Sequence, residues 1–146
     1  MIIEVHSEDE MKLFGERFAT SLRGGDVVEL IGDVGAGKTT LTKGIAKGLG
    51  VDEDVQSPSF TISRVYELSD NRKLAHYDFY RLNEAGLMLD ELSETMANPE
   101  VITVIEWADV VSGVLPENRV SINLSSPSEN IRTLTITGSP VRERKL

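Results

Sequence analysis

The 146-residue sequence contains no cysteine, which excludes disulfide bonds and thiolate metal ligands. It also lacks an apolar run that approaches the ~18 residues needed to cross a membrane as a helix. Its first residues have neither the basic nor the apolar segment of a secretory signal peptide. We therefore expect a cytoplasmic protein without a membrane partner, and the length suits a single domain over residues 1–146.

Basic residues are in the minority, with 15 Lys and Arg against 24 Asp and Glu and a formal net charge of −9. They are scattered, apart from a short basic tail at residues 142–145. Because neutralisation of phosphates dominates nucleic-acid affinity, we expect no autonomous binding of DNA or RNA. The acidity fits a basic protein partner or plain solubility, and the sequence leaves both interpretations open.

Residues 32–39, Gly-Asp-Val-Gly-Ala-Gly-Lys-Thr, match the P-loop (Walker A) pattern G-x-x-x-x-G-K-[ST] at every fixed position. Glycines in such a loop allow successive N–H groups to turn inward and form an anion nest. A lysine there can reach the β- and γ-phosphates, and the threonine hydroxyl can bind Mg²⁺. The predicted nucleotide-binding residues of the loop are Gly32, Asp33, Gly35, Ala36, Gly37, Lys38 and Thr39.

The flanks of this loop fit the motif. The β-branched run at residues 27–31 predicts a strand that enters the loop. Residues 40–49 carry apolar side chains at helical spacing and are followed by Gly50, which predicts a helix that leaves it. Phosphates bound by the loop would lie at a helix N-terminus, where unpaired N–H groups and the helix dipole favour negative charge.

The remaining patterns predict an α/β fold with a mixed parallel and antiparallel sheet flanked by helices. A capping box at residues 7–10 opens a helix that we expect to end at the glycine pair 24–25. The other predicted elements are an antiparallel hairpin of strands 60–66 and 73–80, a helix from Asn83 to about Asn98, a buried parallel strand at 101–105, a short helical segment near 109–114, and a closing hairpin of strands 119–124 and 131–137 around a loop at 125–130.

Two acidic residues follow predicted strands and are candidates for catalysis. Glu106 follows the strand at 101–105, and Asp78 lies near the end of the strand at 73–80. A P-loop enzyme needs an acidic group for Mg²⁺ and for the attacking water. Both acids would face the phosphates if their strands run beside the P-loop strand in the same direction. Ordinary surface acids at strand ends are the other interpretation, and the spacing does not decide which carboxylate binds Mg²⁺.

Four further residues are ambiguous. His76 lies two positions before Asp78, on the same face of a strand, and is either a buried strand histidine or a group that orients an acid or water. Trp107, the single tryptophan, is either a core residue or an exposed anchor beside the site. Arg64 and Arg81 are candidate cis charges for a transition state, with ion pairing at the surface as the alternative. His6 stands in no motif.

Four segments together resemble the bacterial TsaE (YjeE) ATPases of tRNA threonylcarbamoyladenosine synthesis. They are the P-loop at 32–40, Ser-Pro-Ser-Phe at 57–60, His-Tyr-Asp-Phe-Tyr-Arg at 76–81, and Ile-Glu-Trp at 105–107. The loop at 57–60 lies where switch loops of P-loop proteins occur. The resemblance covers residues from about 5 to 125, and its last two segments are the specific ones.

The resemblance implies an ATPase of P-loop fold that supports turnover of the TsaD–TsaB pair, which transfers threonylcarbamoyl to tRNA; contact with tRNA would be indirect, through that pair. It implies that Lys38, Thr39 and Thr40 bind the phosphates of ATP, that Thr39 and Glu106 bind Mg²⁺, and that Asp78 positions water. Switch or partner contacts would come from Ser57, Ser59, His76, Tyr80, Arg81 and Trp107. The chain departs from the family at Ser59, where threonine is usual, so that a hydroxyl is kept and a methyl is lost.

Two other functions compete with a partner-dependent ATPase. A small-molecule P-loop kinase needs an acceptor pocket and a lid that supplies arginines, and this chain has no arginine cluster and little room for a lid. A nucleotide-gated binding module with negligible hydrolysis uses the same residues and is not separated by sequence. A GTPase is disfavoured because the Lys-x-Asp that usually reads guanine is absent.

Overall fold

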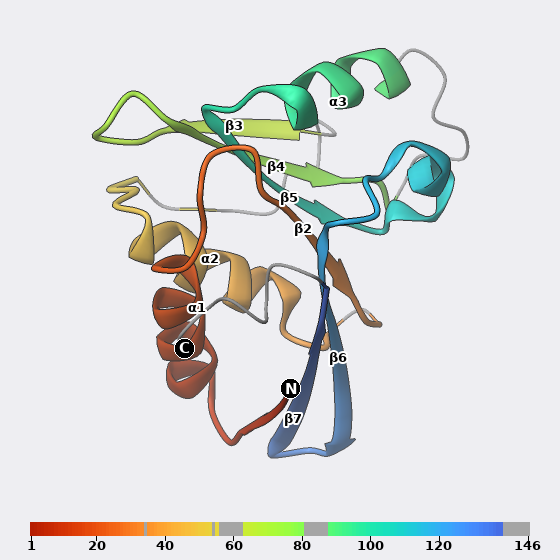
Figure 1. Ribbon diagram of the computed structural model, residues 1–146. Helices are drawn as coiled ribbons and strands as arrows, with labels where there is room; N and C mark the ends of the chain where they lie inside the picture. Colours follow the sequence, from red (N-terminus) through yellow and green to blue (C-terminus); the bar gives the residue numbers. More distant parts are fainter. Residues whose placement is uncertain (34, 54, 56–62, 81–87, 139–146) are drawn as a thin grey trace.

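One mixed sheet organises the fold (Figure 1). The computed structural model describes residues 1–33, 35–53, 55, 63–80 and 88–138. Within them the strands lie in the order β1-β7-β6-β2-β5-β4-β3. The elements are β1 (Ile2–Val5), α1 (Glu8–Ala19), β2 (Val27–Ile31), α2 (Lys38–Gly48), β3 (Ser63–Glu67), β4 (Lys73–Asp78), α3 (Met88–Ala97), β5 (Val101–Glu106), the 3₁₀ helix η1 (Ala108–Val114), β6 (Val120–Ser128) and β7 (Ile131–Thr137).

Parallel pairing dominates the centre of the sheet and antiparallel pairing its edges. β2 pairs in parallel with both β5 and β6, and β4 pairs in parallel with β5. β1 with β7, β6 with β7 and β3 with β4 pair antiparallel. The mixed sheet predicted from the sequence is therefore confirmed.

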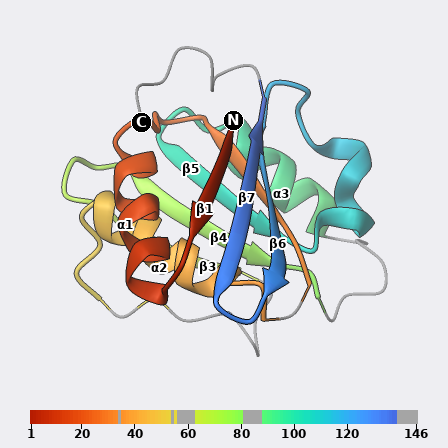
Figure 2. The same cartoon turned by 90° about the horizontal axis from the view of Figure 1, so that it is seen from below.

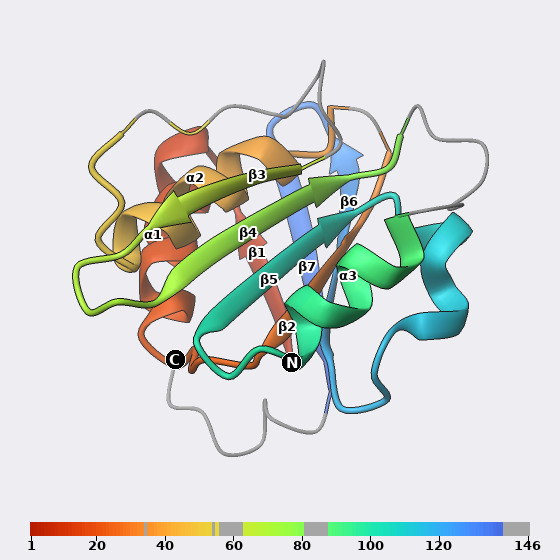
Figure 3. The same ribbon diagram turned by 90° about the horizontal axis from the view of Figure 1, so that it is seen from above.

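Helices cover both faces of the sheet. α1 and α2 lie on one face and α3 and η1 on the other, as Figures 2 and 3 show. Each face has its own cluster of buried apolar side chains, around Phe18 and Leu41 on the first and Tyr77 and Leu92 on the second. All residues of β5 are buried, which explains the near-continuous apolar character of that strand.

The helices α1 and α2 pack unusually closely because glycines lie at their contact. A Cβ on Gly44 of α2 would lie 2.4 Å from the backbone carbonyl oxygen of Lys12 on α1. Gly48 of α2 and Gly15 of α1 leave similarly little room, with backbone atoms 2.6 Å and 2.8 Å from the position of an added Cβ. Since α2 follows the P-loop and α1 follows β1, this contact holds together the two helices that begin at the P-loop and after β1.

The first helix begins where the sequence predicts and ends earlier than predicted. Ser7 caps α1 as expected, because its hydroxyl accepts the N–H of Glu10 at 3.1 Å. The helix ends at Ala19, before the glycine pair, because the Thr20 and Ser21 hydroxyls donate to carbonyls of the last turn at 2.7 Å. The sequence analysis missed β1, whose pairing with β7 is fully non-local.

The closing hairpin is longer than predicted. β6 continues through Ser128, so the residues expected to form a loop at 125–130 largely extend the strand, with a register irregularity between Ser125 and Ser128. Pro127 is tolerated there because the pairing of β6 with β2 ends at Asn123, so that no described strand pairs with that side of β6 beyond this residue. β4 ends at Asp78, two residues earlier than predicted.

Several predicted elements are confirmed where the structure describes them. The helix after the P-loop, the parallel strand at 101–105, the helical segment near 109–114 and the β3–β4 hairpin are all present. The start of the strand predicted at 60–66 and the proposed Asn83 cap of α3 lie outside the described residues.

Candidate nucleotide-binding site

The carboxyl ends of three parallel strands meet at the P-loop. β2 leads directly into the loop, and Glu106 at the end of β5 is opposite Leu30 of β2. Asp78 at the end of β4 is in turn opposite Glu106. The condition set by the sequence, that the two acid-bearing strands run beside the P-loop strand in the same direction, is met.

The P-loop adopts backbone angles that glycine favours. Gly35 and Gly37 have φ values of 83° and 105°, in the left-handed region. Gly37 immediately precedes the first residue of α2, so that the N–H groups of the first turn of α2 open toward the loop. The backbone therefore has the form of an anion-binding helix N-terminus.

Lys38 is buried and already has two contacts. Its ammonium donates a 2.5 Å hydrogen bond to the carbonyl of Gly32 and lies 3.6 Å from the centroid of the Trp107 ring. Burial lowers the pKa of Lys38, while the nearby carboxylates of Glu106, Asp78 and Asp33 act in the opposite direction. The lysine is thus held between an aromatic ring, a carbonyl and negative charge.

Trp107 occupies a strained position at the junction of β5 and η1. Its φ of 56° is left-handed, which is unusual for a bulky side chain and costs on the order of 1 kcal/mol or more. Its ring contacts the ring of Tyr80, with centroids 4.8 Å apart, and Tyr80 is 56% exposed. The side chain is partly buried, packs against the apolar cluster around Tyr77 and Leu92 and borders the cleft, so it lies between the core residue and the exposed anchor that the sequence left open.

His76 is fully buried behind the acids. Its Nε2 lies 2.6 Å from Oε2 of Glu106, whose side chain is 3% exposed. Asp78, on the same strand, accepts the N–H of Tyr80 at 3.0 Å. His76 is therefore a buried strand histidine that also contacts one of the two candidate acids.

A cleft of about 610 Å³ lies between the P-loop and the two strand-end acids. Thr39, Thr40, Asp78, Glu106, Tyr80 and Trp107 border it together with Gly35, Gly37 and Lys38. Asp33 and Ala36 instead border a second cavity of about 500 Å³, which Gly35 and Trp107 also line. Most of the predicted nucleotide-binding residues that are described thus face one common space.

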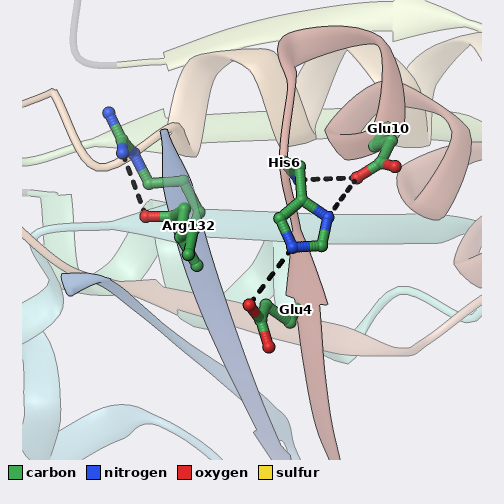
Figure 4. A network of polar contacts seen from close by, with 5 residues as sticks. Glu4, His6, Glu10 and Arg132 are labelled. Carbon is green, nitrogen blue, oxygen red and sulfur yellow. Dashed lines mark hydrogen bonds and ion pairs between the residues drawn. The ribbon is translucent and has the colours of Figure 1, made fainter. Parts of the chain in front are cut away.

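The far wall of the cleft was not predicted. His6 and Ser7, between β1 and α1, border it together with Glu8 and Met11 of α1. Glu129 and Asn130, in the turn between β6 and β7, and Arg132 of β7 complete this wall. His6 lies between Glu4 and Glu10, with ring nitrogens 3.2 Å and 3.4 Å from their carboxylates (Figure 4). No local signal marks these residues, because they reach the P-loop through the pairing of β1 with β7.

The remaining predicted residues, Ser57, Ser59 and Arg81, lie outside the described part of the chain. In the described residues, Arg64 lies in β3 over the ring of Tyr66 and does not border the cleft. Those residues contain no group of three or more His, Cys, Asp and Glu arranged to hold a metal. Their helices include none that is long and apolar enough to span a membrane.

Comparison with known proteins agrees with the geometry. A family model described as "Threonylcarbamoyl adenosine biosynthesis protein TsaE" matches residues 5–134. The TsaE protein of Streptomyces coelicolor is 38% identical over 133 residues, covering 88% of this chain and 90% of the relative. The Bacillus subtilis protein of the same description is 37% identical, covering 88% and 80%.

A solved structure shares the fold. The crystal structure of Bacillus subtilis YdiB superposes with a TM-score of 0.79 at 33% identity, covering 97% of this chain and 87% of that one. A family match over most of the chain, relatives above 30% identity and a P-loop after the central strand of a mixed sheet lead to one conclusion: the chain belongs to the TsaE family.

Proposed function

We propose that this chain is a Mg²⁺-dependent ATPase that supports tRNA threonylcarbamoyladenosine formation. The observation that carries the proposal is the shared cleft, in which the P-loop residues Lys38 and Thr39 face the strand-end acids Asp78 and Glu106. This is the set of groups that nucleotide hydrolysis needs: donors and a cation for the phosphates, a hydroxyl and a carboxylate for the metal, and an acid near the water.

The triphosphate and the nucleoside of ATP are proposed to bind at different ends of the cleft. The N–H groups at the start of α2 favour the phosphates, so the triphosphate is proposed to lie over Gly35–Thr40. The nucleoside then extends toward the opposite wall, where His6, Asn130 and Arg132 offer hydrogen-bonding groups. Arg132 is opposite Val5 in the β1–β7 pairing, which brings it next to His6.

The donors in the cleft suit Mg²⁺. The Thr39 hydroxyl and the Glu106 carboxylate are hard oxygen ligands, which Mg²⁺ prefers, and phosphate oxygens and waters complete such sites. Thr39 and Glu106 would hold Mg²⁺ there, and the ion would supply positive charge against the phosphates. Lys38 is proposed to give up its hydrogen bond to the Gly32 carbonyl and to bind phosphate oxygens instead. Asp78 accepts a hydrogen bond from the attacking water and orients it.

Which acid contacts the metal directly is resolved by comparing the Mn²⁺ affinities of Asp78→Asn and Glu106→Gln.

The isolated chain should hydrolyse ATP slowly, because no described arginine lies at the proposed phosphate end of the cleft. Among the described residues, Arg132 is the one arginine that borders the cleft, and it lies at the proposed nucleoside end. An arginine on the transferring phosphoryl group is worth about 10³–10⁵ in rate in other P-loop enzymes. We propose that the TsaD–TsaB pair completes or stimulates the site, and that hydrolysis resets this pair between rounds of transfer. The net charge of −9 fits a basic surface on the partner.

The test is ATP turnover by the chain alone and with the TsaD–TsaB pair, with modified tRNA measured in the same reaction. Stimulated hydrolysis together with sustained tRNA modification is expected. Modification that persists with a non-hydrolysable ATP analogue would make the chain a nucleotide-gated binding module. Hydrolysis unaffected by the pair, without an effect on modification, would overturn the proposal and direct the search toward a kinase substrate.

Nucleotide binding is expected to change the fluorescence of Trp107. The Lys38 ammonium lies over this ring, and a lysine engaged with phosphates alters that contact. Because Trp107 is the only tryptophan, the signal has a single source. Titration with ATP should shift the emission with the midpoint obtained by calorimetry, whereas adenosine should leave it nearly unchanged. Unchanged emission at saturating ATP would show that the contact with Lys38 persists.

A further inference from the structure

The buried contact between His76 and Glu106 is not used by the mechanism above. His76 is 0% exposed on β4, and its Nε2 lies 2.6 Å from the carboxylate of Glu106 on β5. The two strands are adjacent and parallel, with His76 opposite Val104, so the ring reaches the acid across neighbouring strands. In the described part of the chain, His76 is the one hydrogen-bond partner of that carboxylate.

The metal role proposed for Glu106 decides which atom of the pair is the donor. A carboxylate that binds a metal is ionised and only accepts hydrogen bonds, so Nε2 of His76 would carry the proton and donate it to Oε2 of Glu106. Within the described residues, Nδ1 of the same ring is buried without a hydrogen-bond partner. A buried polar atom without a partner lowers stability, and an apolar side chain would avoid this loss. The contribution of His76 therefore lies in what it does to Glu106.

We infer that His76 is a positioning residue, which holds Oε2 of Glu106 by a hydrogen bond and so directs Oε1 toward the metal position in the cleft. Glu106 is the buried acid at the end of β5, and two staggered torsions of its side chain are otherwise free to turn. Hydrogen bonds behind a metal ligand set its orientation and basicity, and their loss typically lowers metal affinity or activity by about 10–100-fold. The inference rests on the proposed role of Glu106 in binding Mg²⁺.

Two substitutions at position 76 separate orientation from packing. His76→Leu removes the donor and keeps an apolar side chain in the buried space. His76→Gln keeps an N–H donor at a similar distance from the backbone. The Mn²⁺ affinity of each variant is measured by electron paramagnetic resonance in the presence of a non-hydrolysable ATP analogue. Circular dichroism and thermal unfolding establish that each variant is folded.

We expect His76→Leu to lower Mn²⁺ affinity by about 10–100-fold and His76→Gln to recover most of it. Affinity for the ATP analogue measured in EDTA should stay within a few-fold of wild type, because His76 does not line the cleft. A structural role alone would lower both affinities together. Mn²⁺ affinity unchanged by His76→Leu would overturn the inference.

The same experiment in a Glu106→Gln background decides whether His76 acts through Glu106. If it does, adding His76→Leu to Glu106→Gln lowers Mn²⁺ affinity by much less than it does in the wild type. An equal loss in both backgrounds means that His76 acts independently and overturns the inference alone. Unchanged Mn²⁺ affinity in Glu106→Gln itself would instead overturn the proposed metal role of Glu106, and the inference with it.

Discussion

Replacing Lys38 with alanine is expected to reduce ATP hydrolysis by about 10²–10³-fold or more, which is the loss seen when one preorganised donor to a transition-state oxyanion is removed. Lys38 is the P-loop cation, it borders the cleft, and the described cleft offers only Arg132 as another fixed cation. The fold should survive, because the alanine also removes a buried ammonium whose charged form is disfavoured by burial. Turnover is measured with the TsaD–TsaB pair present.

The matched control for this substitution is Lys47→Ala. Lys47 is also on α2, but its side chain is 73% exposed and its contact with Glu16 is a surface ion pair at 3.8 Å. Such pairs contribute about 0–1 kcal/mol, so both turnover and stability should change little.

Glu106→Ala should abolish hydrolysis as Lys38→Ala does. Near-wild-type turnover by either variant would contradict the assignment of the site.

Replacing Gly44 with alanine is expected to lower the free energy of unfolding by about 1–3 kcal/mol and the Tm by roughly 3–12 °C. The added Cβ would lie 2.4 Å from the carbonyl oxygen of Lys12, and that atom belongs to the backbone of α1, so a side-chain rotation cannot relieve the contact. Alanine gains about 1 kcal/mol of helix propensity over glycine. We expect the forced separation of α1 and α2 to outweigh this gain.

Gly113→Ala is the control for this prediction. Gly113 lies in η1, no heavy atom stands within 4 Å of the position of an added Cβ, and its φ is not positive. The Tm of this variant should therefore stay close to that of the wild type. A Gly44→Ala protein as stable as wild type in urea and thermal unfolding would show that the two helices can move apart without loss.

The sequence was sufficient for the part of the site built from local patterns. The P-loop carries its own motif, and the buried run of β5 points directly to Glu106, so the sequence alone named residues that the structure brings together at one side of the cleft. The sequence did not show whether β4 and β5 run parallel to β2, on which the position of both acids depends. The structure shows that they do.

The opposite wall of the cleft could not be predicted, because non-local pairing creates it. His6 and Arg132 are far apart in the chain and become neighbours only through the alignment of β1 with β7. β1 is four residues long, too short for its alternation to be distinguished from an irregular N-terminus. The end of β6 was also predicted wrongly. Residues 125–128 are serines and a proline, which are common in turns, but pairing with β7 keeps them extended.

The contacts of Lys38 in the free protein make the arrival of phosphate an exchange of ligands. The ammonium leaves the Gly32 carbonyl, the Trp107 ring or both, so only the difference between old and new contacts adds to affinity. A weak net gain lowers the penalty for product departure, because the same two groups take the lysine back as the phosphates leave. Contacts that compete with the phosphates in this way lower the affinity and speed the release of the nucleotide, which would suit the ATPase cycle proposed above.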